Sequence, residues 1–215
     1  MKPARPFRVR EYVTDRGSSP FREWLTDLDV TAKARIQARV FRFESGNLGD
    51  YKSVGNGVLE SRLDFGPGYR IYFGIDEGDL VLLLIGGTKR TQRRDILQAR
   101  EYWADYQMRN RDMARRTRDW NKGLANDLKD TTFMRAFINA SLDEGIPIQE
   151  VLRKLVDVVG LKETSKKTKI PSPNLVRALN PKHNPTLDTL NRILRPFGLK
   201  LSVTVIEKKP SRSAA

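Results

Sequence analysis

The spacing of apolar residues changes along the first half of the chain. Apolar and polar side chains alternate in FRVREYV, residues 7–13, which predicts a half-buried strand. Helical spacing follows in two segments, and Ser19 and Pro20 are typical of an N-cap and a first helical residue. The apolar stripes of these two helices are Phe21, Trp24, Leu25 and Leu28, and then Val30, Ile36, Val40 and Phe43.

The remainder of this half predicts three strands and a closing helix. The strands are expected near residues 58–65, 69–75 and 80–85, separated by the turn sequences FGPG and DEGD. The closing helix carries on one face Ile96, Ala99, Trp103 and Tyr106. A strand, two helices, three antiparallel strands and a helix make a small α+β domain.

Arg70 stands between two tyrosines in GPGYRIYF, residues 66–73. We expect Phe65 to lie opposite Tyr69, because this register gathers the apolar side chains of the hairpin on one face. The other face then carries Glu60, Arg62, Asp64, Arg70 and Tyr72. In this register Asp64 lies opposite Arg70, so a cross-strand ion pair is an ordinary explanation for the arginine beside a functional one.

The second half has helical spacing almost throughout. Two apolar stripes end at Gly145 and Gly160. Three short helices are then expected near residues 162–168, 173–179 and 186–195. Short helices joined as tightly as those flanking KIPS form a helix-turn-helix. The alternation in LKLSVTVIE, from Leu199, predicts a strand that must pair with a second copy or with a neighbouring sheet.

Composition and charge narrow the class of protein. The chain has no cysteine, which excludes disulfide frameworks and thiolate chemistry. No apolar run suits a membrane span and the N-terminus lacks the apolar core of a secretory signal, so we expect a cytoplasmic protein without a membrane partner. The net charge of +14 is concentrated after residue 107, where 22 basic residues face 11 acidic ones, against 18 and 15 before it. This asymmetry favours a nucleic-acid partner.

The charged stretch MRNRDMARRTRDWNK, residues 108–122, separates the two halves. It indicates a linker at residues 108–120 between domains at residues 1–107 and 121–207, with a disordered tail at residues 208–215. Because Arg and Met are good helix formers, the stretch could instead prolong the preceding helix.

Three motifs of the first half are specific when taken together: GPGYRIYF, the apolar strand LVLLLI, and GG-x-K-x-T-Q-x-x-DI before the closing helix. With these motifs, residues 7–107 resemble the HigB-like addiction-module killer toxins of the RelE/ParE superfamily. The resemblance implies a RelE/ParE-like fold and an endoribonuclease that cuts messenger RNA, often in the ribosomal decoding site, by attack of a ribose 2′-hydroxyl on the adjacent phosphate. Ser61 departs from the family pattern, which usually has an apolar residue there.

Such a reaction needs cations beside the phosphate and groups that move two protons. Arg70 and Arg62 are our candidates for the phosphate, because a guanidinium is planar and stays charged. Lys89 could add charge or act as base or acid, and Tyr72 could stack on a base or hold a proton. The first half has no histidine, the usual proton shuttle. A ParE-type inhibitor of DNA gyrase is therefore an alternative.

The second half is most distinctive in NLVRALNPKHNPTLDTLNRILRPFGLKL. From about Asp119 to Val205 it resembles the antidotes of these same toxins, which belong to the XRE-like helix-turn-helix class. The resemblance implies that Ser172 caps the recognition helix, and Asn174 and Arg177 suit adenine and guanine in the major groove. Phosphate contacts are expected from Lys166, Lys167, Lys169 and Lys182. Lys169 and Pro171 depart from the family turn, which usually has glycine and serine there.

We interpret the chain as a toxin joined to its antidote. Tethering gives the antidote half a high effective concentration at the toxin half, so a nuclease held inactive is expected. Pairing can occur within one chain or between chains of a homodimer that binds promoter DNA and represses its own expression. A second alternative is a DNA-binding transcriptional regulator with an inactive toxin half. No cofactor or metal is expected, because His183 lies in a Pro-rich loop without a cluster of ligands.

Overall fold

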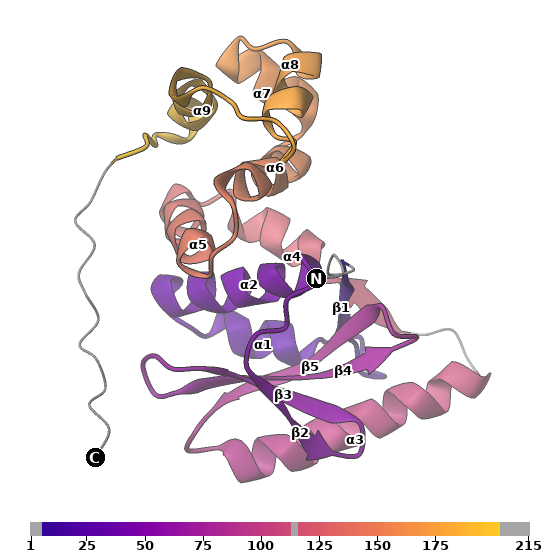
Figure 1. The fold of residues 1–215 in the computed structure, drawn as a ribbon. Coiled ribbons are helices and arrows are strands. Elements are labelled where there is room, and N and C mark those ends of the chain that lie inside the picture. Colours follow the sequence, from indigo (N-terminus) through magenta and orange to yellow (C-terminus); the bar gives the residue numbers. More distant parts are fainter. Residues whose placement is uncertain (1–5, 113–115, 203–215) are drawn as a thin grey trace.

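A computed structural model describes residues 6–112, here called the N-terminal part, and residues 116–202, the C-terminal part (Figure 1). The protein is α+β, with a single sheet and a largely helical C-terminal part. The strands are β1 (Arg8–Tyr12), β2 (Tyr51–Gly55), β3 (Val58–Leu63), β4 (Tyr69–Asp76), β5 (Leu80–Thr88) and β6 (Thr117–Asp119). The helices are α1 (Pro20–Thr26), α2 (Val30–Glu44), α3 (Gln92–Asp112), α4 (Trp120–Asp127), α5 (Thr131–Asp143), α6 (Ile148–Val159), α7 (Leu161–Thr168), α8 (Ser172–Ala178) and α9 (Leu187–Leu194), followed by the 3₁₀ turn η1 (Arg195–Phe197).

The strand order is β2-β3-β4-β5-β1-β6. The three strands predicted in the middle of the N-terminal part are confirmed as the antiparallel neighbours β3, β4 and β5, while β1 pairs with β5 in parallel. Two strands were not predicted. β2 has little apolar character and is mostly exposed, and β6 is only three residues long and carries two charges. Neither gives an alternation that sequence reading can detect.

The predicted register of the β3–β4 hairpin is wrong by two residues. Tyr69 lies opposite Leu63 rather than Phe65, and Arg70 lies opposite Arg62 rather than Asp64. The reason is a wider loop: the Phe65 amide donates to the Leu63 carbonyl and the Gly68 amide to the Phe65 carbonyl, so pairing stops at Leu63. A slip of two residues keeps every side chain on its face, and the predicted division into an apolar and a polar face is therefore preserved.

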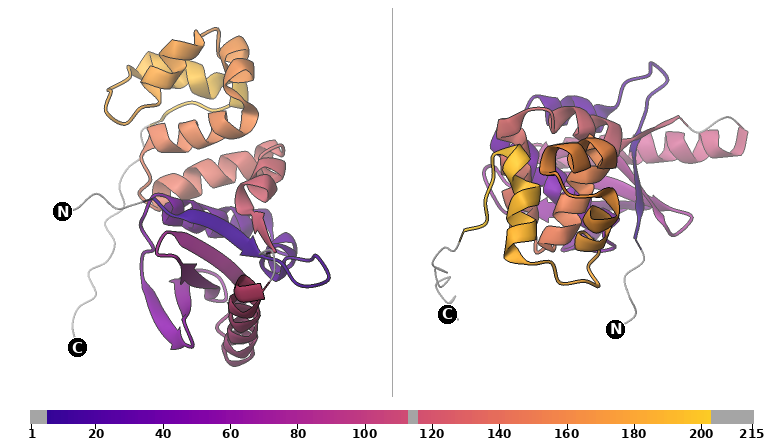
Figure 2. Two further views of the ribbon diagram at one scale, coloured as in Figure 1. Left: turned by 90° about the vertical axis from the view of Figure 1, so that its right-hand side faces the viewer. Right: turned by 90° about the horizontal axis from the view of Figure 1, so that it is seen from above.

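The sheet is covered on both faces (Figures 1 and 2). α1 and α2 pack on one face, and the Ser19 hydroxyl caps α1 at the Arg22 amide, as the sequence predicts for a helix that begins at Pro20. α3 packs on the other face with the predicted stripe around Ala99, Trp103 and Tyr106. Gly74 of β4 permits this approach, because an added Cβ would lie 2.3 Å from Trp103 ring atoms.

The C-terminal helices are stacked on the α1–α2 side of the sheet, with α5 against α2 and the tip formed by α7, α8 and α9 (Figures 1 and 2). The segment expected as a linker is structured at both ends. α3 continues to Asp112, and residues 117–119 form β6 at the sheet edge beside β1. The connection between the two parts is therefore shorter than the sequence suggested.

The helices predicted near residues 162–168, 173–179 and 186–195 are confirmed as α7, α8 and α9. Ser172 is not the N-cap of α8. It is the first helical residue, and Pro171 takes the cap position without a side-chain hydrogen bond, because proline has no side-chain acceptor. The Pro171 carbonyl accepts from the amides of Asn174 and Leu175. The strand predicted from Leu199 has no pairing at residues 199–202 and otherwise falls, like the predicted tail, outside the described residues. Across the described ranges, no helix is long and apolar enough to cross a membrane.

Candidate functional sites

A buried carboxylate gathers polar side chains from four elements of the N-terminal part. Glu60 of β3 has no exposed surface. Its partners are Lys52 Nζ (3.5 Å), Arg62 Nε (3.3 Å), Arg70 Nε (3.6 Å), the Tyr72 hydroxyl (3.2 Å) and Gln92 Nε2 (2.7 Å). We call these six residues the Glu60 cluster. It places three cations around one anion, so a net positive charge remains for a ligand.

The protonation states within the Glu60 cluster follow from burial and charge. Burial alone would raise the pKa of Glu60, but the hydrogen bond from Gln92, the charge of Lys52 and the two arginines outweigh it, and the pKa lies below its usual value. Burial, together with the neighbouring Glu60 carboxylate, raises the pKa of Tyr72. Glu60 is therefore ionised and Tyr72 protonated at neutral pH.

The four candidate catalytic residues lie at different depths. Arg62 has 40% of its side chain exposed and Lys89 is exposed, whereas Arg70 has only 11% exposed. Arg70 and Lys89 meet at Gly68, whose carbonyl accepts from Arg70 Nη1 at 2.7 Å and from the Lys89 amide at 2.9 Å. Arg70 Nε has no hydrogen-bond partner within the described ranges. Tyr72 is fully buried beneath α3, so its ring is not available for stacking on a base here.

A basic groove continues from Lys89 along the start of α3. Its volume is about 440 Å³, and it is lined by Lys89, Arg90, Thr91, Gln92, Arg93 and Arg94. Gln92 also belongs to the Glu60 cluster, so the groove and the cluster share one surface of the molecule. Such a surface suits a polyanion better than a small apolar ligand.

Replacement of Glu60 by glutamine is expected to lower the free energy of unfolding at neutral pH, because the ion pairs of the cluster are lost while the shape is kept. A carboxyl whose pKa is lowered in the folded state stabilises that state above its unfolded pKa, and this contribution is lost as the pH falls through the folded pKa. The difference in the free energy of unfolding between wild type and Glu60→Gln should therefore disappear as the pH falls below 4.5. Urea unfolding of both proteins across this range is the measurement, and a constant difference would contradict the expectation.

The N-terminal and C-terminal parts share one hydrophobic core. Trp120 of α4 has no exposed surface, and Phe41 of α2 lies 6.0 Å from Phe137 of α5 between ring centroids. All three lie in the same cluster of buried side chains as Ile71 and Phe73 of β4. The two parts are thus packed as one body rather than joined by a polar contact.

Three carboxylates form ion pairs across this interface. Asp127 accepts from Arg22, Lys33 and Gln37. Glu44 accepts from Trp120 Nε1 at 2.8 Å and from Asn121 and Lys154, and Glu144 accepts from Arg39 and Arg42, each at 2.9 Å. Removing one partner of such a poorly exposed pair is costly, because it leaves the other charge without compensation.

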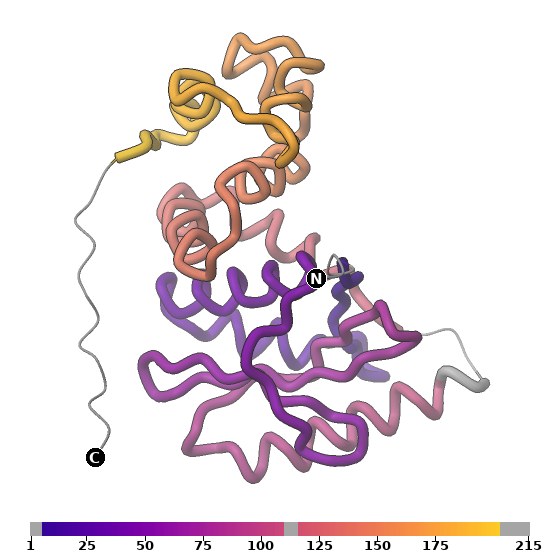
Figure 3. Tube along the Cα trace, viewed as in Figure 1, coloured from indigo at the N-terminus to yellow at the C-terminus, as the bar shows by residue number. Residues whose placement is uncertain are grey.

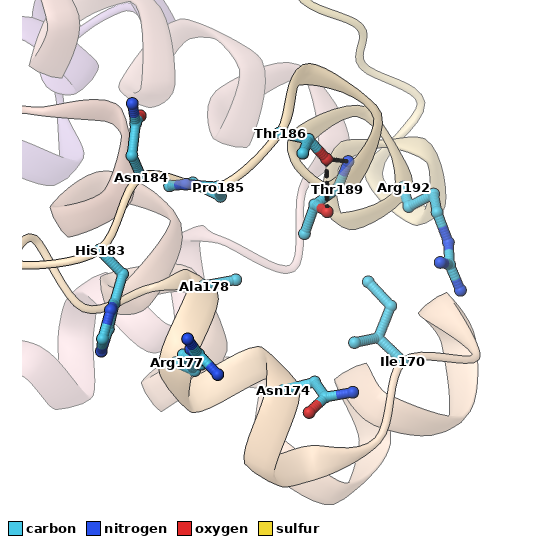
Figure 4. A pocket seen from close by; sticks show the side chains of 10 residues that line it. All are labelled: Ile170, Asn174, Arg177, Ala178, His183, Asn184, Pro185, Thr186, Thr189 and Arg192. Carbon is cyan, nitrogen blue, oxygen red and sulfur yellow. Dashed lines mark hydrogen bonds between the residues drawn. The ribbon is translucent and has the colours of Figure 1, made fainter.

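The tip of the C-terminal part contains a groove of about 420 Å³ between α8 and the start of α9 (Figure 4). Asn174 and Arg177 lie on the exposed side of α8 and line it, with Thr189 and Arg192 of α9 across the gap. The Thr186 hydroxyl caps α9 at the Thr189 amide, 3.2 Å away. Ser172 is partly buried at the start of α8 and is not among the residues lining this groove.

The predicted phosphate-contacting lysines are all exposed but do not form one cluster. Lys166, Lys167 and Lys169 lie at the end of α7 and in the turn after it, where Lys169 adopts a left-handed conformation with φ of 56°. Lys167 and Lys169 line a groove of about 400 Å³ with Arg192 and Arg195, which the sequence did not single out. Lys182 lies apart, in the loop before α9. No group of metal-ligating side chains occurs in residues 6–112 or 116–202, and His183 lies in that same loop.

Glu60, Lys52 and Gln92 were missed as candidate functional residues. Glu60 shares the face of Arg62 and Arg70 by simple alternation, and this signal was available in the sequence. Lys52 and Gln92 come from β2 and from the first turn of α3, and no sequence spacing connects them with β3.

Comparison with known proteins finds a relative of part of the chain. No family model matches the chain, and no solved structure matches it. A protein of Haemophilus influenzae, whose name is given only as "Uncharacterized protein", is 51% identical over 81 residues, which make up 37% of this chain and 82% of that protein. The chain therefore belongs to the family of this H. influenzae protein.

Proposed function

We propose that the chain is a toxin fused to its antidote and that it acts in the cytoplasm. The N-terminal part corresponds to a RelE/ParE-like endoribonuclease that cuts messenger RNA at the ribosome, and the C-terminal part to an XRE-type helix-turn-helix antidote. The observation that carries this proposal is the Glu60 cluster, which gathers cations on a buried carboxylate in the segment that resembles such toxins.

The depths of the candidate residues suggest a division of roles. Arg62 and Lys89 contact the phosphate that is attacked by the 2′-hydroxyl, since both are accessible. Arg70 supplies charge from beneath. Glu60 and Tyr72 are too deeply buried to meet RNA and instead fix the two guanidinium groups. Preorganised cations of this kind stabilise charge that develops on a phosphate during reaction.

The antidote role is supported by the shared core and by the ion pairs of Asp127 and Glu144. The described contacts of the C-terminal part fall on β1, α1, α2 and the adjoining turns. Within the described ranges, the side chains of Arg62 and Arg70 bond only to Glu60 and Gly68, all in the N-terminal part. We therefore propose that the antidote restrains the toxin without covering the Glu60 cluster.

The DNA-binding role rests on α7 and α8 as a helix-turn-helix with α8 in the major groove. Asn174 and Arg177 face outward from α8 and read bases, while the lysines of α7 and its following turn hold phosphates. A homodimer would place two such helices on a palindromic operator upstream of the gene.

The comparison with H. influenzae supports the idea of a fusion. About four-fifths of that protein is accounted for by a segment that makes up little more than a third of this chain. A segment of this chain thus exists elsewhere with few additional residues, as a domain of a fused pair would.

Induced expression of residues 1–112 alone in bacteria tests the toxin assignment. We expect growth arrest with cleavage of messenger RNA, and no arrest from the full chain or from the same fragment carrying Arg70→Ala. The Arg70 variant separates catalysis from the general burden of a partly folded fragment. Arrest with intact transcripts and impaired supercoiling would replace the nuclease by a gyrase inhibitor. A fragment that is soluble but causes no growth arrest would favour the remaining alternative, a DNA-binding regulator with an inactive toxin half.

A further inference from the structure

Ser61 is a polar residue on the apolar face of β3, and it is fully buried. It lies between Glu60 and Arg62, whose side chains point to the opposite face. Its partner is Arg39 of α2, which donates from Nη1 to the Ser61 hydroxyl at 3.5 Å and to the Arg62 carbonyl at 3.2 Å. The departure of Ser61 from the toxin pattern therefore coincides with a contact between α2 and the strand of the Glu60 cluster.

Arg39 is also held from the other side. Its Nε donates to Glu144 of the C-terminal part at 2.9 Å, and the side chains of Arg39 and Glu144 are only 14% and 15% exposed. Gly49, with φ of +66°, leaves room for this arginine, because an added Cβ would lie 3.2 Å from Arg39 Nη1. Arg39 thus connects Glu144 of the C-terminal part with the Ser61 hydroxyl and the Arg62 carbonyl of β3.

Among the residues that the structure describes, the polar contacts made by Asp127 and Glu44 do not lead to β3. Asp127 reaches Arg22, which continues to Glu11 of β1, and Glu44 lies at the end of α2. Arg42 donates to the same Glu144 oxygen as Arg39, also at 2.9 Å, but in the described part of the chain its side chain has no bond to β3. Arg42 is therefore a matched comparison for Arg39 within one ion-pair group.

We infer that Arg39 is a positioning residue through which the C-terminal part holds β3, and with it the Glu60 cluster, in a restrained state. This inference rests on the proposed function. In that state Arg70 is committed to the Gly68 carbonyl and to Glu60 and is nearly withdrawn from solvent. Because the Arg70 side chain is only 11% exposed, its full contact with a phosphodiester requires β3 and β4 to shift. The charged hydrogen bond from Arg39 to the Arg62 carbonyl resists this movement of β3. Loss of the Arg39 contacts with β3 lets the Glu60 cluster bind single-stranded RNA.

The test uses the full chain with Arg39→Lys, Arg39→Ala, Arg42→Ala and Glu144→Gln. Lysine at position 39 keeps a charge for Glu144 but cannot bridge two acceptors in the way a guanidinium does, so this variant guards against simple misfolding. Hydrogen exchange of the peptide covering β3 measures the restraint. Fluorescence anisotropy with a short, labelled single-stranded RNA measures the affinity of the cluster.

Both Arg39 variants are expected to speed amide exchange in β3 by about tenfold and to tighten RNA binding several-fold. Glu144→Gln should do the same to a smaller extent, and Arg42→Ala should leave β3 exchange at the wild-type rate. Equal effects of the Arg39 and Arg42 variants, or weaker RNA binding after loss of Arg39, would overturn the inference. If β3 exchange responds as expected but no variant binds RNA, the link stands and the proposed nuclease fails.

Discussion

Truncation of Trp120 to alanine is expected to destabilise the whole chain by about 3–5 kcal/mol, the usual cost of removing a large aromatic side chain from a core. Trp120 is fully buried, its Nε1 donates to Glu44 at 2.8 Å, and Lys154 Nζ lies 5.0 Å from its ring centroid. Because the core is continuous between the two parts, wild type and variant should each unfold in a single transition.

Urea unfolding followed by tryptophan fluorescence and by far-ultraviolet circular dichroism measures this effect. Tyr51→Ala is the control, because this aromatic side chain lies on the edge strand β2 with 46% of its surface exposed and should matter much less. Two separate transitions in the wild type, or a Trp120 variant as stable as the Tyr51 variant, would show that the two parts fold independently.

On the proposed DNA-binding role of α8, Arg177→Ala is expected to weaken binding to the DNA upstream of the gene by about 1–3 kcal/mol, the range for loss of a bidentate contact to guanine. Arg177 lies on the exposed side of α8 and lines the groove that faces α9 (Figure 4). Binding to unrelated DNA should change far less, so the ratio of specific to non-specific affinity falls. Electrophoretic mobility shifts with both DNAs provide this ratio.

Lys167→Ala is the matched variant for this measurement. It removes a charge from the end of α7, so it should weaken binding to both DNAs alike and reduce the salt dependence by about one unit of slope. Equal losses on both DNAs from Arg177→Ala would instead make Arg177 a phosphate contact and remove α8 as the element that reads bases.

The path of the chain in Figure 3 follows the order of elements that the hydrophobic pattern predicts, apart from β2, β6 and α4, which were not predicted, and the strand expected from Leu199, which has no pairing at residues 199–202. Alternation identified the faces of β3 and β4 correctly, because a period of two is unchanged by a slip of two residues. The same insensitivity explains why the pairing of Arg70 with Asp64 was wrong. Register depends on the geometry of the loop at residues 64–68, for which the sequence offers several solutions.

The depth of Tyr72 could not be predicted from its strand alone. It depends on α3, whose apolar stripe around Trp103 covers that face of the sheet. The contacts of Asp127, Glu44 and Glu144 were equally inaccessible, because each joins residues about 75 or more positions apart and charged side chains have no periodicity of burial. Arg62, Arg70 and Lys89 were identified from the sequence, whereas Lys52 and the carboxylate of Glu60, which organises the cluster, were not.

The placement of β6 has a consequence for synthesis of the chain. β1 leaves the ribosome before both strands that flank it, since one of its edges pairs with β5 and the other with β6, more than 100 residues later. Glu44 likewise has to be synthesised before two of its hydrogen-bond donors, Trp120 and Lys154. Since domains otherwise begin to fold from the N-terminus during translation, a nascent chain holds an unfinished sheet until the C-terminal part emerges. The sheet of the N-terminal part thus receives its last strand only after the residues of β6 have been synthesised.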